Sequence, residues 1–242
     1  MRVESGRKTT MKAQTQLVTE GTFCKESMTE TPVKPALRAT QSNDPNSRNV
    51  KSETRDAVDG RTKDYLTEAE MKRFLDAARS GRHGVRDYAL LLMAYRHGMR
   101  VSELIDVRLS DVDLVTARLF VRRKKGSLST HQPIEGDELR AIKAWLRQRS
   151  LNNSSNCSPF LFLSERGPMT RQAVSYLVGQ TGRRADLSSR VHPHTLRHSC
   201  GYYLANRGYD TRLIQDYLGH RNIAHTVRYT RTAATRFEGL WR

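Results

Sequence analysis

Residues 194–198, with the sequence His194-Thr195-Leu196-Arg197-His198, are the first indication of what this chain acts on. They open a predicted helix from about Thr195 to Asn206, which ends before Gly208. Arginine donates paired hydrogen bonds to phosphate oxygens, and histidine exchanges a proton near neutral pH. The motif is informative only together with the other segments that accompany it in the chain.

Four more short segments lie on either side of this motif in the chain. Arg100 precedes Lys124 by 24 positions, and Tyr229 follows His220 by nine. In this order and at these intervals, the residues resemble the tyrosine recombinase (phage integrase) family, in which an Arg, a hairpin Lys, a His-x-x-Arg pair, a His or Trp and a Tyr follow one another. The four segments are Gly98-Met99-Arg100-Val101-Ser102-Glu103-Leu104, Lys124-Lys125-Gly126, Leu218-Gly219-His220 and Val227-Arg228-Tyr229.

The resemblance covers roughly residues 63–231, and within the family it is closest to the compact fimbrial phase-switch recombinases. As in those proteins, a short leader passes directly into the catalytic region, and the Lys-Lys-Gly turn at 124–126 is followed by Ser129-Thr130-His131. The resemblance implies a fold that is mainly α with a small antiparallel β-sheet. It implies site-specific recombination, in which duplex DNA is cleaved and rejoined through a covalent 3′-phosphotyrosine intermediate. Inversion, excision and integration all remain open, and no metal or other cofactor is expected.

Two arginines, a histidine and a tyrosine carry the expected strand cleavage. Attack on a phosphodiester builds negative charge on its non-bridging oxygens, so Arg100 and Arg197 are natural stabilisers of that charge. His220 would add a third donor to the same oxygens. Tyr229 would be the nucleophile, and its hydroxyl, with an ordinary pKa of about 10, must lose a proton during attack.

The remaining expected roles concern proton transfer and support. His194 would be the base or proton relay for the phenol. The resemblance assigns the proton of the leaving 5′ oxygen to a hairpin lysine, with Lys124 preferred over Lys125. Glu103 lies one helical turn after Arg100 and would orient the arginines. All six catalytic side chains are expected to meet around one phosphate, with the phenol aimed at phosphorus.

The folded region is expected to begin with a strong helix start. Thr67 can cap the helix, Glu70 can complete a capping box, and Leu66 with Met71 can form a hydrophobic staple. Alternating apolar residues around the turn at 124–126 predict a hairpin with strands near 119–121 and 132–134. Further helices are predicted near 85–95, from about 101, over 137–149, after Thr170 and over 210–218, and a short buried strand over 160–163.

The chain is expected to divide into a polar, disordered leader at 1–61 and a catalytic domain at 62–242 whose last part, 232–242, is a separate tail. The net charge is +17, yet residues 1–60 hold 10 Lys or Arg against 8 Asp or Glu. Nearly all of the positive excess therefore belongs to the region predicted to fold. The tail carries Phe237, Leu240 and Trp241 and cannot form a core alone, so it is expected to dock on its own domain or on a neighbouring protomer.

The basic charge favours nucleic acid as the partner, because a polyanion concentrates on a basic surface. Double-stranded DNA is the expected partner, bound by a homotetramer on two recombination sites, with DNA-bending accessory proteins possible. The run Arg122-Arg123-Lys124-Lys125 at the hairpin tip is expected to contact phosphates. Three widely spaced cysteines fit a reducing compartment, and no apolar run is long enough to span a bilayer, so a cytoplasmic, nucleoid-associated protein without membrane contact is expected.

Several other interpretations compete with this one. A non-catalytic DNA-binding regulator on the same scaffold and a type IB topoisomerase-like enzyme both share much of the pattern. An unrelated helix-turn-helix regulator built from residues 209–229 would leave Arg100 and Lys124 unexplained. His192, His194 and His198 with Cys200 suggest a metal site, but their spacing is poor for tetrahedral coordination. His198 is interpreted as a buried, hydrogen-bonded side chain rather than a catalytic one.

Overall fold

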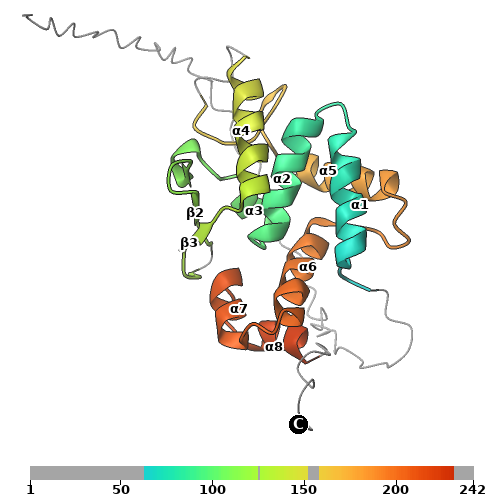
Figure 1. Ribbon diagram of the computed structural model, residues 1–242, viewed down its shortest axis with the longest axis vertical. Helices are drawn as coiled ribbons and strands as arrows, with labels where there is room; N and C mark the ends of the chain where they lie inside the picture. The colour runs from blue at the N-terminus through green and yellow to red at the C-terminus, as the bar shows by residue number, and fades with distance from the viewer. Residues whose placement is uncertain (1–62, 125, 152–157, 232–242) are drawn as a thin grey trace, which may run out of the picture. The chain divides into compact units, whose positions relative to one another are not determined.

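The computed structural model describes residues 63–124, 126–151 and 158–231, which fall within one compact unit. The leader predicted at 1–61, Lys125 and the tail at 232–242 lie outside the described residues. The described region is mostly helical with two small antiparallel sheets, as Figure 1 shows. The helices are α1 (Glu68–Arg79), α2 (Gly84–Arg96), α3 (Val101–Leu104), α4 (Gly136–Ser150), α5 (Arg171–Arg184), α6 (Pro193–Asn206), α7 (Thr211–Leu218) and α8 (Ala224–Thr230), with a short 3-10 turn at Leu109–Asp111.

The start of α1 is as the sequence predicts. The Thr67 side chain accepts a hydrogen bond from the backbone of Glu70, and the Glu70 carboxylate accepts one from the backbone of Thr67. Leu66 and Met71, on either side of this capping box, are both buried. Local residue chemistry therefore fixes where the ordered helix begins.

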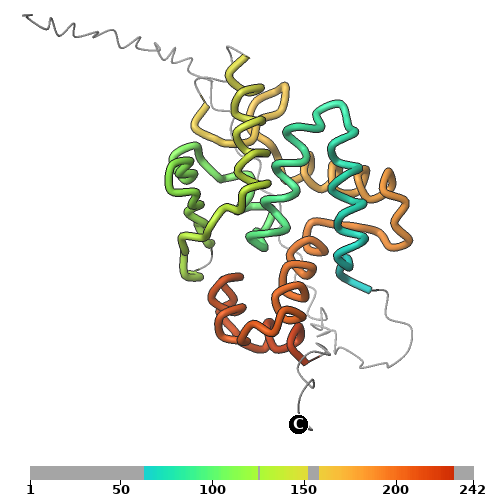
Figure 2. The backbone as a smooth tube through the Cα atoms, in the orientation of Figure 1, coloured from blue at the N-terminus to red at the C-terminus, as the bar shows by residue number. Residues whose placement is uncertain are grey.

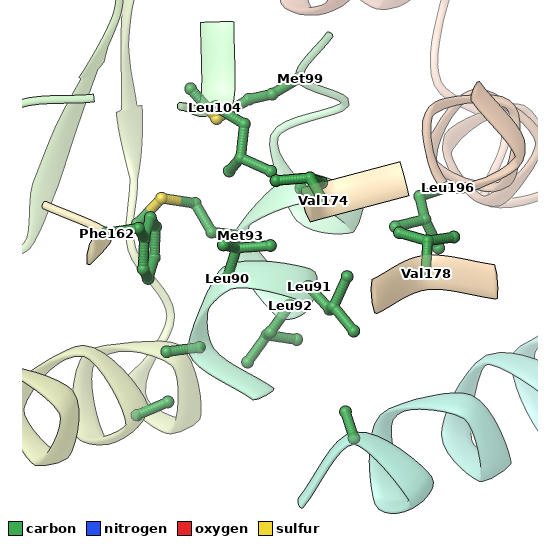
Figure 3. Close-up of a cluster of buried hydrophobic side chains, with 14 of the residues drawn as sticks. Leu90, Leu91, Leu92, Met93, Met99, Leu104, Phe162, Val174, Val178 and Leu196 are labelled. Atoms are coloured by element: carbon green, nitrogen blue, oxygen red, sulfur yellow. The ribbon is translucent and has the colours of Figure 1, made fainter. Parts of the chain in front are cut away.

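The main hydrophobic core is built around α2, which lies between α1 and α4 in Figure 1. Residues 89–94 are all buried, so this helix is apolar on nearly every side. Figure 3 shows side chains from other elements around it, among them Phe162 from the loop before β4, Val178 from α5 and Leu196 from α6. The burial of residues 89–94 makes α2 the support for the site residues that follow it in sequence.

The predicted hairpin is present and gains a third strand. Strands β1 (Val112–Asp113), β2 (Arg118–Val121) and β3 (Thr130–Pro133) form one antiparallel sheet in that order. The strand predicted over 160–163 is placed differently, since β4 (Leu163–Ser164) begins where it was expected to end and pairs with β5 (Gly167–Pro168). Phe160 forms only an isolated bridge with Arg108.

The last three helices form a second, smaller core, and Figure 2 shows the chain turning from α6 through α7 into α8. Gly219 ends α7 in a left-handed conformation, φ +66°, which is the usual glycine cap. Tyr229 lies within α8 and is fully buried in this core. No helix in the described ranges has the length and apolar character that crossing a membrane requires.

Candidate active site

Arg100 caps the amino end of α3, directly after the turn that leaves α2. Gly98 makes this turn with φ +53°, and a Cβ there would lie 2.3 Å from Leu218. The Arg100 guanidinium donates a hydrogen bond of 2.7 Å to Glu103, whose other oxygen accepts the Arg100 backbone N–H at 3.0 Å. The arginine side chain is about a quarter exposed, at 27 %, so it can still be approached from solvent.

Glu103 is the buried acceptor that organises this part of the site. Besides Arg100, it accepts hydrogen bonds from Nη1 of Arg123 at 2.9 Å and from the backbone N–H of Lys124 at 3.4 Å. Burial raises the pKa of this carboxyl, but the Arg100 bond and the charge of Arg123 outweigh it, and the pKa lies below its ordinary value. The sequence suggested that Glu103 orients the arginines, and it does contact Arg100. The second arginine that it contacts is Arg123 rather than Arg197.

Arg123 corrects the expectation that the whole basic run of the hairpin faces phosphate. Its guanidinium is buried and donates to the carbonyl oxygens of His97 at 2.9 Å and Tyr217 at 2.5 Å, in addition to Glu103. Arg122 is engaged with Asp111, at 2.6 Å. Arg123 therefore attaches the hairpin to α2 and α7 and is a structural residue.

Lys124 is the hairpin lysine that the structure describes. Its ammonium group forms an ion pair with Asp106, and its side chain remains 44 % exposed. An exposed ion pair contributes little to stability, so the lysine can exchange this partner for another at small cost. Its competitor for the same role, Lys125, is outside the described residues.

Arg197 connects α6 to the turn after α2 and to the end of α7. It is buried, and its guanidinium donates hydrogen bonds to the carbonyl oxygens of Gly98 and Leu218, the latter at 2.8 Å. Burial, together with the positive charges of Arg100 and Arg123, lowers the pKa of Arg197 to about 10. Three arginines thus lie close together, and an anion placed among them would relieve their mutual repulsion.

Two predicted histidines lie beside this arginine cluster. His194 is in the first turn of α6, and partial burial with the charges of His192, Arg197 and Arg100 lowers its pKa. His220 follows the cap of α7, and burial with the charges of Arg197 and Arg100 lowers its pKa to about 3. Both rings are therefore neutral at pH 7.

Tyr229 lies against His220 but is covered. Its side chain is 1 % exposed, its ring stacks on that of His220 with centroids 6.2 Å apart, and its hydroxyl lies 2.8 Å from Nδ1 of His198. Burial raises its pKa to about 12, although the charge of Arg197 opposes the rise. The structure thus brings the tyrosine beside the site, while the expectation that its phenol points at a phosphate is not met in this conformation.

His198 is the site residue whose importance the sequence interpretation missed. It was expected to be buried and hydrogen-bonded, and it is half-buried with the Tyr229 hydroxyl as its partner. Burial lowers its pKa to about 4, so its neutral Nδ1 can accept the phenol hydrogen. The available signal was the spacing of four residues from His194, which puts both rings on one face of α6.

Gly201 provides the space that the Tyr229 ring occupies, and it supports a testable prediction. A Cβ on Gly201 would lie 2.6 Å from the ring, so Gly201→Ala must overpack it at a cost of about 1–3 kcal/mol. Over most of this range the cost exceeds the gain of about 1 kcal/mol that alanine brings to a helix. We expect a net loss of stability in urea denaturation. Gly179→Ala is the matched control, because nothing lies within 4 Å of that Cβ, and it should be stabilising. Equal gains in both variants would contradict the packing described here.

Comparisons with known proteins agree with this geometry. The model of the phage integrase family matches residues 64–236. The type 1 fimbriae regulatory protein FimE of Escherichia coli (strain K12) is 48% identical over 178 residues, covering 73% of this chain and 90% of FimE. The tyrosine recombinase XerC of Halalkalibacterium halodurans is 37% identical over 185 residues, 74% of this chain and 61% of XerC.

A solved structure supports the same relationship at the level of the fold. The crystal structure of XerA recombinase is similar with a TM-score of 0.63 and 31% identity, over 71% of this chain and 61% of XerA. The alternative of an unrelated helix-turn-helix regulator is therefore wrong, since the family match spans nearly the whole described region. The chain belongs to the phage integrase family, the tyrosine recombinases, which are enzymes that cut and rejoin DNA at specific sites.

Proposed function

We propose that this chain cleaves and rejoins duplex DNA through a 3′-phosphotyrosine bond at Tyr229. The observation that carries the proposal is the position of the tyrosine at the edge of a cationic cluster. The Tyr229 ring stacks on that of His220 with centroids 6.2 Å apart, and Arg197 binds the carbonyl oxygen of Leu218, two residues before His220. A phosphodiester held by this cluster would lie beside the ring of the nucleophile.

In the proposed reaction, three side chains stabilise charge on the phosphate. Arg100 and Arg197 donate to the non-bridging oxygens, where negative charge develops during attack. His220 is neutral, and its Nδ1 lies 2.9 Å from the hydroxyl oxygen of Thr226. In the proposed tautomer the Thr226 hydroxyl donates to Nδ1, and Nε2 carries the proton and donates a third hydrogen bond to the phosphate.

Proton transfer accompanies the exchange of bonds at phosphorus. The Tyr229 oxygen forms a bond to phosphorus, the bond from phosphorus to the 5′ oxygen breaks, and the phenol proton passes to a histidine. His194 is the assigned base, and His198 already holds the hydroxyl in the resting structure. Lys124 leaves Asp106 and gives a proton to the 5′ oxygen. Reversal by another strand's 5′ hydroxyl needs no nucleotide, because the phosphotyrosine conserves the bond energy.

The assembly and the outcome of the reaction are part of the proposal. A homotetramer on two sites, with DNA-bending accessory proteins, would exchange the strands, and residues 232–242 would join neighbouring protomers. Residues 62–242 would then form the catalytic domain behind a polar leader at 1–61. The similarity to a fimbrial regulatory protein supports inversion over excision or integration. A cytoplasmic protein on the nucleoid would have access to such sites.

A covalent trap tests the proposal. Target duplexes are first selected from a random-sequence library by repeated binding to the protein, and then prepared with single nicks that let the cleaved end diffuse away. The wild-type protein should form a denaturation-resistant adduct, with the DNA attached to the peptide that contains Tyr229. Selected binding without any adduct would instead support the silent regulator. An adduct without exchange between two sites would support a topoisomerase-like enzyme.

A further inference from the structure

The three residues before the capping box, Asp64, Tyr65 and Leu66, lie against the helices that hold the nucleophile. The Asp64 carboxylate forms an ion pair with Arg228 of α8. The Tyr65 ring packs on that of Tyr202 in α6, with centroids 4.0 Å apart. The backbone N–H of Leu66 donates to the Ser199 hydroxyl at 2.8 Å. We call residues 64–66 the strap, because one short segment is attached to both α6 and α8.

Two of the three strap contacts, those of Asp64 and Tyr65, involve residues that lie directly against Tyr229. Tyr202, under the Tyr65 ring, meets the Tyr229 ring edge to face with centroids 5.1 Å apart. Arg228, the partner of Asp64, precedes Tyr229 in the chain and lies 5.8 Å from its ring centroid. The strap therefore contacts the nucleophile's immediate neighbours from two sides and is separated from it by one side chain in each case.

The nucleophile cannot react where the strap holds it. Attack requires phosphorus to come within about 3–3.5 Å of the phenol oxygen, in line with the leaving group. The Tyr229 side chain is 1 % exposed, and its hydroxyl is bonded to His198. Part of α8 must therefore move away from α6 before a phosphate can reach the oxygen, and contacts that join α8 to the strap oppose this movement.

We propose that Asp64 and Tyr65 are positioning residues that keep Tyr229 covered between reactions, so that cleavage requires release of the strap. This inference rests on the proposed function of Tyr229 as the nucleophile. The two residues act by different forces, since Asp64 contributes a half-exposed ion pair and Tyr65 a ring contact. Removing the side chain interaction of either Asp64 or Tyr65 should make the covered state of Tyr229 less favourable.

Exposure of Tyr229 in the free protein is the first measurement. Hydroxyl-radical labelling followed by mass spectrometry compares its reactivity with that of Tyr217, whose hydroxyl donates to the Arg96 carbonyl at 3.0 Å. In Tyr65→Ala, labelling of Tyr229 should rise about tenfold relative to Tyr217. Tyr65→Phe retains the ring and should match the wild type. A general loss of structure would raise the labelling of Tyr229 and Tyr217 together. That outcome would count against a specific role for the strap.

The rate of adduct formation on the selected nicked duplex is the second measurement. Asp64→Asn should react about threefold faster than the wild type in a single turnover, and Tyr65→Ala about tenfold faster. Glu165→Gln is the charge-matched control, because it also removes one negative charge and breaks an exposed ion pair, with Arg82, elsewhere. Glu165→Gln should react at the wild-type rate. Asp64→Glu keeps the carboxylate and should also react at the wild-type rate.

Rates for Asp64→Asn and Tyr65→Ala that equal the Glu165→Gln rate, or fall below it, would overturn the inference. So would a rise in Tyr229 labelling without a faster reaction, because covering would then not limit cleavage. If the wild type forms no adduct on any selected duplex, the proposed function fails. The labelling ratio, measured without DNA, still decides whether the strap covers the tyrosine.

Discussion

Replacing Tyr229 with phenylalanine is expected to abolish the covalent adduct while leaving DNA binding intact. Phenylalanine fills the same space against Gly201 and His220 and loses only the hydroxyl that meets His198. Loss of that hydrogen bond should change the free energy of unfolding by about 1 kcal/mol. No other group in the proposed reaction supplies the attacking oxygen, so the adduct should fall below detection, a reduction of at least about 10⁴-fold.

Binding and cleavage are measured on the same selected duplex, by gel shift and by denaturing gel. Tyr217→Phe is the matched control, since it also removes the hydroxyl of a partly buried tyrosine, here one bonded to the Arg96 carbonyl. It should retain the adduct. An adduct formed by Tyr229→Phe would show that another residue is the nucleophile.

Arg197→Lys is expected to reduce the single-turnover cleavage rate by about 10²- to 10³-fold. A lysine ammonium has no fork of donors, so it cannot hold the Gly98 and Leu218 carbonyls and also bind two phosphate oxygens. The positive charge is kept, and long-range attraction of DNA should change little. The loss should therefore lie in the rate of the chemical step rather than in affinity.

A stability effect has to be separated from this loss of rate. An unsatisfied buried carbonyl costs about 1–3 kcal/mol, so Arg197→Lys should also melt at a lower temperature. Arg149→Lys is the control. Arg149, in α4, is likewise buried and donates a hydrogen bond of 2.6 Å to the carbonyl oxygen of Ser158. If the two variants lose cleavage equally at equal stability, Arg197 has no role in the chemistry.

Local residue patterns predicted the elements that depend on neighbours in the chain. The capping box at Thr67 and the hairpin around Gly126 are of this kind, and both are present where expected. The burial of Arg123 was not predicted, because a run of basic residues was interpreted as a surface. The strand period does predict this burial. Leu119 and Val121 are buried, and Arg123 is the next residue on the same side of the strand.

The arrangement around Tyr229 could not be read from the sequence in the same way. Its contact with His198 joins residues 31 positions apart, and its cover includes Tyr202, which packs on Tyr65 at the other end of the described region. Such contacts arise from how α6 and α8 pack together, and no periodicity in either helix specifies them. Motif order thus indicated which residues share a site, while the conformation of the nucleophile required the tertiary structure.

The carbonyl oxygen of Gly98 receives hydrogen bonds from both Arg123 and Arg197. One backbone atom is therefore a shared anchor for the hairpin, for α6 and for the turn that carries Arg100. In the proposed reaction, the arginines that bind the phosphate are thus already held in place by backbone carbonyls, whereas the Tyr229 hydroxyl is still bonded to His198. If Tyr229 is the nucleophile as proposed, such a division would let the protein bind many phosphates and break very few.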